Sequence, residues 1–182
     1  MSEVTLFAVR QADGRRLWEY PWKTKYEINA ADPVVFGNRM LITSGYEHGC
    51  ALLEFTTSGA TRRWESEALS MQINCPVVHD GFVYGFDENR FKCLRLQDGR
   101  EQWLERGLGQ GSLMMSSDGR LIIMSEKGEL VIAQADPRKF HLLARAQILP
   151  QTKCWTSPVL ANGRIYARNA AGDFVCVEVG GQ

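Results

Sequence analysis

A motif that ends in an aromatic residue recurs along the chain at intervals near 40 residues. In each copy an apolar segment leads into a turn such as Asp-Gly or Asp-Pro, and the aromatic residue follows a few positions later. The aromatic positions are Trp18, Trp64, Trp103 and, in a degenerate copy, His141. The intervals between them are 46, 39 and 38 residues. Because one blade of a β-propeller takes about 40–50 residues, this period predicts a propeller.

A second motif has the same period and predicts a β-hairpin in every repeat. Each copy has a short apolar run, a tight turn and a second apolar run. The turn pairs are Gly37-Asn38, Asp80-Gly81, Asp118-Gly119 and Asn162-Gly163. Such pairs favour type I′ turns, in which both central residues take positive φ angles. Turn chemistry and spacing therefore support the same fold independently.

Each repeat is predicted to form four antiparallel strands, which we name A to D in chain order. Residues 100–108 and 130–149 also have helical features, but Pro137 would break the second helix. Both stretches align with strands of the other repeats, so we predict strands there. The predicted fold is all-β, with about four blades in one domain or half-propeller. The expected units are a partial blade at 4–20, complete blades at about 31–66, 75–105 and 112–146, and a partial blade at 156–179.

The repeats resemble the pyrroloquinoline-quinone (PQQ) repeats of propellers in the quinoprotein alcohol dehydrogenase-like superfamily. In that family a small residue on strand C precedes an Asp-Gly or Thr-Gly turn, and a Trp follows on strand D. The strand C positions here are Ala8, Cys93, Val131 and Cys176. The resemblance implies that Trp18, Trp64 and Trp103 lodge between adjacent blades as structural residues.

The resemblance also implies a ring of about eight blades, twice what this chain provides. The chain is therefore expected to be the C-terminal half of a larger propeller, or a half-ring that pairs with a second copy. An open stack of blades would leave strand edges unpaired, which is an aggregation hazard. The resemblance further implies a periplasmic or extracellular location, although Met1-Ser2-Glu3-Val4 has no features of a signal peptide.

Charge and hydropathy argue against two classes of partner. Lys and Arg together number 21, as do Asp and Glu, so the formal net charge is zero. A nucleic-acid-binding domain normally carries a basic excess or stripe. No apolar run approaches the roughly 18 residues of a membrane-spanning helix. We therefore expect neither a nucleic acid nor a membrane as partner.

The cysteines and histidines do not form a metal-binding pattern. The five cysteines are Cys50, Cys75, Cys93, Cys154 and Cys176, and the three histidines are equally scattered. A zinc site would require close pairs of such residues. Most of the thiols are expected to be small buried hydrophobic groups, while a disulfide between distant positions stays open.

The residues also give no support for an active site. A dehydrogenase of the resembled family would have a pair of adjacent cysteines over the quinone, Ca²⁺ held by Glu and Asn, and an Asp base. No adjacent cysteines occur here, so we assign no catalytic, cofactor-binding or metal-binding residue. PQQ with Ca²⁺ enters only through the family resemblance. The glycine-rich stretch 106–112 is similar to a phosphate loop, but a hairpin rather than a helix follows it, so phosphate binding is not expected.

Polar residues recur at the predicted B–C turns and should face one rim of the ring. These candidate ligand-facing residues are Tyr46, Glu47, His48, Asp87, Glu88, Glu126 and Asn169. Their carboxylates could form an acidic rim suited to a cation or a polar ligand. The alternative is that hairpin turns are simply polar and solvated. On the first hypothesis, Asp87→Asn with Glu126→Gln changes ligand or Ca²⁺ binding and leaves stability unchanged.

Three classes of function are compatible with these observations. The favoured one is a non-catalytic scaffold that offers its rim or channel to a protein or small-molecule ligand. The alternative is a fragment or subunit of a PQQ-dependent oxidoreductase acting on alcohols or sugars. A lyase or hydrolase has only the fold in its favour. Added PQQ and Ca²⁺ would distinguish the first two classes, because only the oxidoreductase would bind the quinone chromophore.

Overall fold

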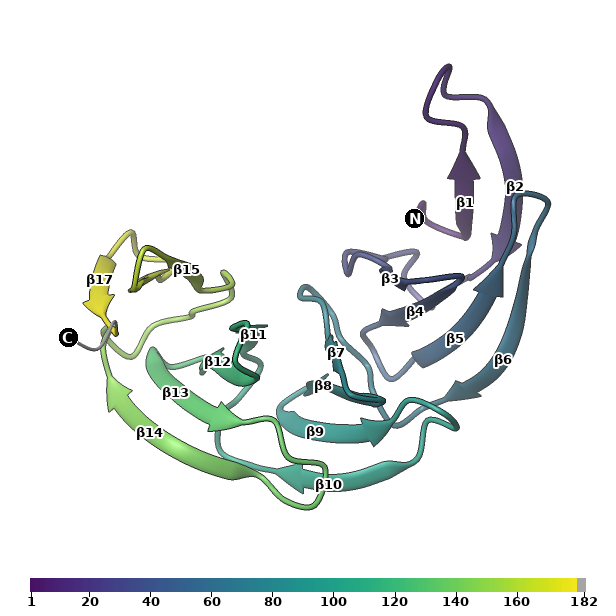
Figure 1. The fold of residues 1–182 in the computed structure, drawn as a ribbon. Helices are drawn as coiled ribbons and strands as arrows, with labels where there is room; N and C mark the ends of the chain where they lie inside the picture. The colour runs from purple at the N-terminus through teal and green to yellow at the C-terminus, as the bar shows by residue number, and fades with distance from the viewer. Residues whose placement is uncertain (180–182) are drawn as a thin grey trace.

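The computed structural model describes residues 1–179, which form five antiparallel sheets along an open arc (Figure 1). We number the sheets as blades 1 to 5 in chain order. Blade 1 has β1 (Thr5–Val9) and β2 (Arg16–Pro21). Blade 2 has β3 (Val34–Phe36), β4 (Arg39–Ser44), β5 (Gly49–Phe55) and β6 (Ala60–Ser66). Blade 3 has β7 (Val77–His79), β8 (Phe82–Asp87), β9 (Arg90–Arg95) and β10 (Glu101–Glu105). Blade 4 has β11 (Ser112–Met115), β12 (Arg120–Met124), β13 (Glu129–Gln134) and β14 (His141–Gln147). Blade 5 has β15 (Val159–Ala161), β16 (Arg164–Arg168) and β17 (Phe174–Glu178).

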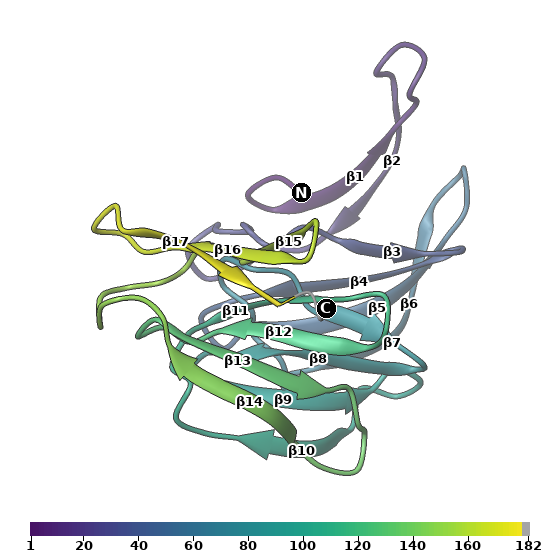
Figure 2. The same ribbon diagram turned by 60° about the vertical axis from the view of Figure 1, so that its left-hand side comes forward.

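The all-β prediction is confirmed, with three sheets of four antiparallel strands and two smaller ones. Residues 100–108 and 130–149 contain β10, β13 and β14, so the strand assignment there is correct. Within residues 1–179 there is no helix long and apolar enough to cross a membrane. Strands A lie on the inner side of the arc and strands D on its outer side (Figure 1). Figure 2 shows β11 to β14 side by side as one twisted sheet.

Two of the A–B hairpins have the backbone that type I′ turns need. Asp80 and Gly81 have φ angles of 46° and 80°, and Asn162 and Gly163 have 50° and 71°. Asn and Asp tolerate this left-handed region better than other non-glycine residues, because their short side chains can hydrogen-bond locally. The Asx-Gly signal therefore predicted both turns correctly.

The other two A–B hairpins differ from the predicted type. The connection between β11 and β12 has four residues, 116–119, and only Gly119 has a positive φ, at 81°. Ser116 closes it by donating its backbone N–H to the carbonyl of Arg120 at 2.9 Å. In the pair Gly37-Asn38 only the glycine has a positive φ, at 60°. Neither turn therefore has the two positive φ angles of type I′.

The core lies between the blades, because both faces of the middle strands are covered. Ile42 and Leu53, fully buried, pack toward blade 1 with Trp18, whereas Leu41 and Cys50 pack toward blade 3. Burial on both faces removes the need for alternating polar residues. This explains the continuous apolar runs of β4 and β12.

Each D strand has a β-bulge one residue before the position that holds the tryptophan. In register, Trp18 pairs with Ala8, Trp64 with Leu52, and Trp103 with Cys93. Each indole N–H donates to a backbone carbonyl of the next blade: Trp18 to Thr56 at 2.9 Å, Trp64 to Leu96 at 2.9 Å, and Trp103 to Asp136 at 2.8 Å. The structure therefore places the three tryptophans between adjacent blades.

The sequence alignment assigned the wrong residue, His141, to the tryptophan position of blade 4. In blade 4 the register is Ile132 with Ala144 and Ala133 with Leu142, so Leu143 is the bulge and Ala144 has the position of the tryptophan. His141 instead pairs with Gln134 at the start of β14 and is exposed. The cause is the spacing between the strand C partner and this position, which is 12 residues in blade 4 and ten residues in blades 1 and 3. The strand C partner is accordingly Ile132, and not Val131.

Candidate functional site

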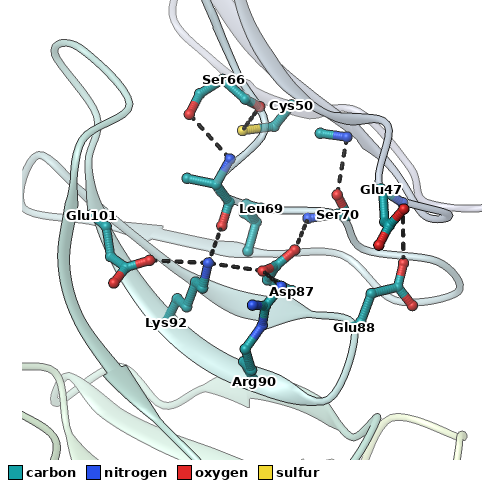
Figure 3. A network of polar contacts seen from close by, with 12 residues as sticks. Glu47, Cys50, Ser66, Leu69, Ser70, Asp87, Glu88, Arg90, Lys92 and Glu101 are labelled. Atoms are coloured by element: carbon teal, nitrogen blue, oxygen red, sulfur yellow. Dashed lines mark hydrogen bonds and ion pairs between the residues drawn. The ribbon is translucent and has the colours of Figure 1, made fainter.

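The predicted site residues lie on one rim, formed by the B–C turns and by the D–A connections between blades. We call this rim the B–C rim, and the opposite one, formed by the A–B hairpins and C–D turns, the A–B rim. The structure brings Tyr46 and Glu47 of blade 2 into contact with Glu88 of blade 3, as Figure 3 shows for Glu47 and Glu88. Glu126 and Asn169 lie in the turns of blades 4 and 5, so the seven residues are not one cluster.

Glu88 of blade 3 holds the B–C turn of blade 2 in an unusual conformation. Tyr46 and Glu47 have φ angles of 59° and 60°, in the left-handed region that non-glycine residues rarely adopt. Both backbone N–H groups donate to Oε1 of Glu88, at 2.8 Å from Tyr46 and 3.4 Å from Glu47. Such backbone conformations cost about 1–3 kcal/mol each and persist only where the surroundings fix them. Here the Glu88 carboxylate supports the turn together with the bond from the His48 N–H to the Gly45 carbonyl at 3.4 Å.

Two tyrosines are displayed beside this turn. Tyr46 is 37% exposed and Tyr26, in the connection that leads into blade 2, is 53% exposed. Their rings meet edge to face with centroids 4.8 Å apart, and Nζ of Lys25 lies 5.2 Å from the centroid of the Tyr26 ring. The pair is therefore an ordered aromatic patch on the surface.

His48 contacts the same connection through Trp22. Its ring meets Trp22 edge to face at 4.6 Å, and the Trp22 indole N–H donates to Oγ of Ser44 at 2.8 Å. Ser44 in turn donates to Oδ1 of Asn29 at 2.5 Å. Trp22 and Asn29, which lie on either side of Tyr26 in the sequence, are therefore both tied to blade 2, with His48 packed against Trp22.

Asp87 faces the interior of the molecule. It is 3% exposed, and its Oδ1 accepts the backbone N–H of Ser70 at 3.2 Å. Its Oδ2 lies 2.5 Å from Nη2 of Arg90 and 2.8 Å from Nζ of Lys92 (Figure 3). Lys92, also buried, reaches Oε2 of Glu101 at 3.0 Å and donates to the carbonyl of Ala68 at 3.0 Å. This network fixes the connection between blades 2 and 3, so replacing Asp87 is expected to lower stability, contrary to the expectation from sequence.

Glu126 and Asn169 also bond within the protein. Oε2 of Glu126 accepts the backbone N–H of Gln110 at 3.3 Å. Asn169 is buried, and its Oδ1 accepts the backbone N–H groups of Ala171 at 3.0 Å and Asp173 at 2.9 Å. Glu126 therefore stabilises the connection that leads into blade 4, and Asn169 stabilises the B–C turn of blade 5.

The rim carboxylates of Glu47, Asp87, Glu88 and Glu126 do not fit a site for PQQ held by Ca²⁺. Three of the four rim carboxylates accept bonds from backbone amides, and Asp87 is also enclosed by two cationic side chains. Within residues 1–179, no group of three or more His, Cys, Asp or Glu side chains is placed to hold a metal ion.

The sequence analysis missed the D–A connections. Tyr26 lies in one, and others are joined along the rim by side chains: Asn74 donates to the carbonyl of Gly111 at 3.2 Å, Ser157 donates to Oδ1 of Asn74 at 3.1 Å, and Gln110 donates to Gln72. These segments differ in length and composition from blade to blade, so no periodic signal marks them.

Consecutive antiparallel blades, three of them four-stranded, with tryptophans of the outer strands β2, β6 and β10 bonded to the next blade, define a β-propeller built from PQQ-like repeats. A family model described as outer membrane protein assembly factor BamB matches residues 2–105, more than half of the sequence. The chain belongs to this family of PQQ-like propellers. A comparison with curated proteins found no match.

Solved structures with the same fold include natural and designed propellers. BamB from Moraxella catarrhalis matches with a TM-score of 0.68 and 15% identity, over 96% of this chain and 51% of that chain. The computationally designed Ika8 protein matches with a TM-score of 0.71 and 12% identity, over 97% of this chain and 53% of that one. The designed Ika4 protein gives 0.62 and 14%, over 83% and 91%. These identities establish the fold alone, and the chain spans about half the length of BamB and Ika8.

Proposed function

We propose that this chain is a non-catalytic propeller scaffold that binds a partner protein at the B–C rim, with Tyr46 and Tyr26 as its anchors. The observation that carries the proposal is the left-handed turn at Tyr46 and Glu47, held from the next blade by Glu88. Strained backbone of this kind is concentrated at functional sites. Here the strained turn holds Tyr46 at the surface, where its ring packs against Tyr26.

The composition of the patch supports protein recognition. Tyrosine supplies a large contact area with few rotatable bonds and is enriched among the residues that dominate binding energy at interfaces. The edge-to-face contact orders both rings before a partner arrives, which lowers the entropic cost of binding. Charged groups at Lys25, Glu47 and Glu88 provide the polar rim that such interfaces have.

The family supplies the biological setting of this proposal. Its description names an assembly factor of outer membrane proteins. We therefore propose that the partner is a protein of outer membrane assembly and that the chain acts in the periplasm. Since the chain spans about half of BamB, we also propose that a second copy or further blades complete the ring. Light scattering tests the second copy, which predicts a mass near twice 20.5 kDa.

Site-specific photo-crosslinking tests the rim. A benzophenone amino acid at position 46 or 26 is expected to give one discrete product with a bacterial envelope fraction, identified by mass spectrometry as an outer membrane assembly component. The same amino acid at the exposed Arg164, on the opposite rim, is the matched control. The proposal fails if position 164 gives the same product, or if the product is unrelated to outer membrane assembly.

A paired variant separates recognition from folding. Tyr46→Asn removes the ring and leaves a residue that tolerates the left-handed region. For this test the benzophenone amino acid is placed at position 47. We expect Tyr46→Asn with Tyr26→Ser to abolish the crosslink from that position. The melting temperature should stay within a few degrees of the parent chain. An undiminished crosslink would show that the tyrosines are not the anchors.

A further inference from the structure

The A–B rim carries a groove between blades 2 and 3 that is lined by basic and apolar residues. Its volume is about 570 Å³. The basic lining residues are Arg39, Arg63 and Arg95, and the apolar ones include Leu52, Phe82 and Leu96. The groove lies between two complete blades, and it is formed by the turns at the opposite ends of the strands from Tyr46.

The fold directs the arginines into this groove. Arg63 is the bulge residue of β6, between Arg62, which pairs with Leu53, and Trp64, which pairs with Leu52. A bulge re-aims the side chain of the extra residue. Arg95 is the last residue of β9 and pairs with Phe82, and Arg39 is the first residue of β4. Strand pairing therefore fixes the backbones of Arg39 and Arg95, and it fixes both neighbours of Arg63.

The arginines are only partly neutralised by the protein itself. Arg95 makes a bidentate contact with Asp98, at 2.9 Å and 2.5 Å. Arg63 lies 3.5 Å from Oε2 of Glu54, with 57% and 35% of the two side chains exposed, and exposed pairs of this kind contribute little. Arg39 forms no ion pair with any residue in the range 1–179. The groove therefore has an excess of positive charge.

Equivalent grooves elsewhere in the molecule lack this charge. The groove between blades 1 and 2, about 580 Å³, has Leu17 at the bulge position and no charged residue in its lining. The groove between blades 4 and 5, about 490 Å³, is lined by one acidic residue, Asp118, and one basic residue, Arg120. The repeat thus forms a groove at these three blade junctions, and the sequence makes the one between blades 2 and 3 basic.

We propose that this groove binds an extended acidic peptide segment of a partner protein. Guanidinium groups bind carboxylates through paired, charge-assisted hydrogen bonds, which suits Arg39 and Arg63 to flanking Asp or Glu side chains. Leu52, Phe82 and Leu96 would contact an apolar residue between the two carboxylates. Because the site lies on the opposite rim from Tyr46, it is independent of the function proposed above.

Fluorescence anisotropy with defined peptides tests the proposal. The probe is a fluorescein-labelled peptide with the sequence Gly-Asp-Glu-Phe-Glu-Asp-Gly, and the control peptide has Asn and Gln in place of Asp and Glu. At low salt we expect the acidic peptide to bind at least about tenfold more tightly than the amide peptide, since charge complementarity is the source of the preference. Equal affinity for the two peptides would overturn the proposal.

Matched variants locate the binding. Arg39→Gln with Arg63→Gln is expected to weaken binding of the acidic peptide by at least about tenfold. Arg164→Gln, at the first residue of strand B in blade 5, is the control and should bind as the parent chain does. Both sets of substitutions are at exposed positions, so unchanged melting curves would show that the fold is intact. Unchanged binding by the double variant, or full displacement of the peptide by a few millimolar inorganic phosphate, would show that no peptide groove exists.

Discussion

The indole N–H of Trp64 donates a 2.9 Å hydrogen bond to the carbonyl oxygen of Leu96, in the C–D turn of the following blade. The same relationship joins Trp18 to Thr56 and Trp103 to Asp136. Since each bond joins an outer strand to the turn after strand C of the next blade, the contact fixes how consecutive blades pack. It is the structural reason for the tryptophan period in the sequence.

Removing the indole donor is expected to weaken the junction between blades 2 and 3. Trp64→Phe keeps an aromatic ring but leaves the Leu96 carbonyl without this partner, so we expect a loss of about 1–2 kcal/mol in the free energy of unfolding. Urea unfolding followed by circular dichroism measures it.

The matched control for this prediction is His141→Phe. His141 has the aligned position in the sequence but lies exposed at the start of β14. We expect a change within about 0.5 kcal/mol, as for other surface substitutions. A larger loss at His141 than at Trp64 would contradict the register described here.

The fold could be predicted because the repeats carry redundant signals. Tryptophan spacing, Asx-Gly hairpins and apolar runs all indicate four-stranded blades, and the structure contains these strands. The alignment of His141 with the tryptophans was wrong because counting residues detects neither how far strands C and D pair beyond the bulge nor where the bulge lies. Those depend on strand pairing, here Ile132 with Ala144, which only the structure gives.

The site was harder to predict because a turn residue can point inward. Asp87 was expected to face a ligand or solvent at the rim, yet it is the last residue of β8 and its carboxylate contacts Lys92 in the interior. A signal was available in the lysine within the otherwise apolar strand Phe91–Leu94, since a buried lysine requires an acidic partner. Tyr26 had no comparable signal, because its connection is not repeated.

Lys92 is expected to be among the most sensitive polar positions in the chain. It is 5% exposed and lies within 3.0 Å of both Asp87 and Glu101. Lys92→Met fills the same space but leaves Asp87 with less compensating charge in a buried site, so we expect a loss of about 3 kcal/mol. Thermal or urea unfolding would measure it.

The double variant Asp87→Asn with Lys92→Met provides the control. It removes both charges of the pair, so it should be more stable than Lys92→Met alone. If the double variant is instead less stable by the sum of the two single losses, Asp87 and Lys92 do not interact as described.

The thiols are expected to differ sharply in reactivity. Burial raises the pKa of Cys50 and of Cys93 to about 12, and burial also raises the pKa of Cys154 and of Cys75. Because the thiolate is the reactive form, these groups should react slowly. Cys176 is exposed, and all five thiols are free in the structure.

Titration with a chromogenic disulfide reagent at pH 8 tests this order. We expect one fast thiol, assigned to Cys176 because Cys176→Ser abolishes the fast phase, and a slower partial reaction at the half-buried Cys75. Cys50, Cys93 and Cys154 should react only in denaturant. A fast reaction of two or more thiols in the folded chain would show that the inter-blade core opens more readily than its burial indicates.

Asp136 is expected to contribute to stability in a defined acid range. The guanidinium of Arg138 and the Arg138 backbone N–H both hydrogen-bond its carboxylate and lower its pKa to about 2. A carboxylate with a lowered pKa in the folded state stabilises the protein fully above its ordinary pKa, near 4, and this contribution is lost as the pH falls toward 2.

The variant Asp136→Asn tests this contribution. It has no carboxylate to protonate, so its stability should fall less than that of the parent chain between pH 4 and pH 2. Urea unfolding of both proteins at half-unit pH steps measures the difference, which isolates Asp136 from the other carboxylates that titrate in the same range. Parallel curves for the two proteins would mean that the contact with Arg138 does not persist in solution.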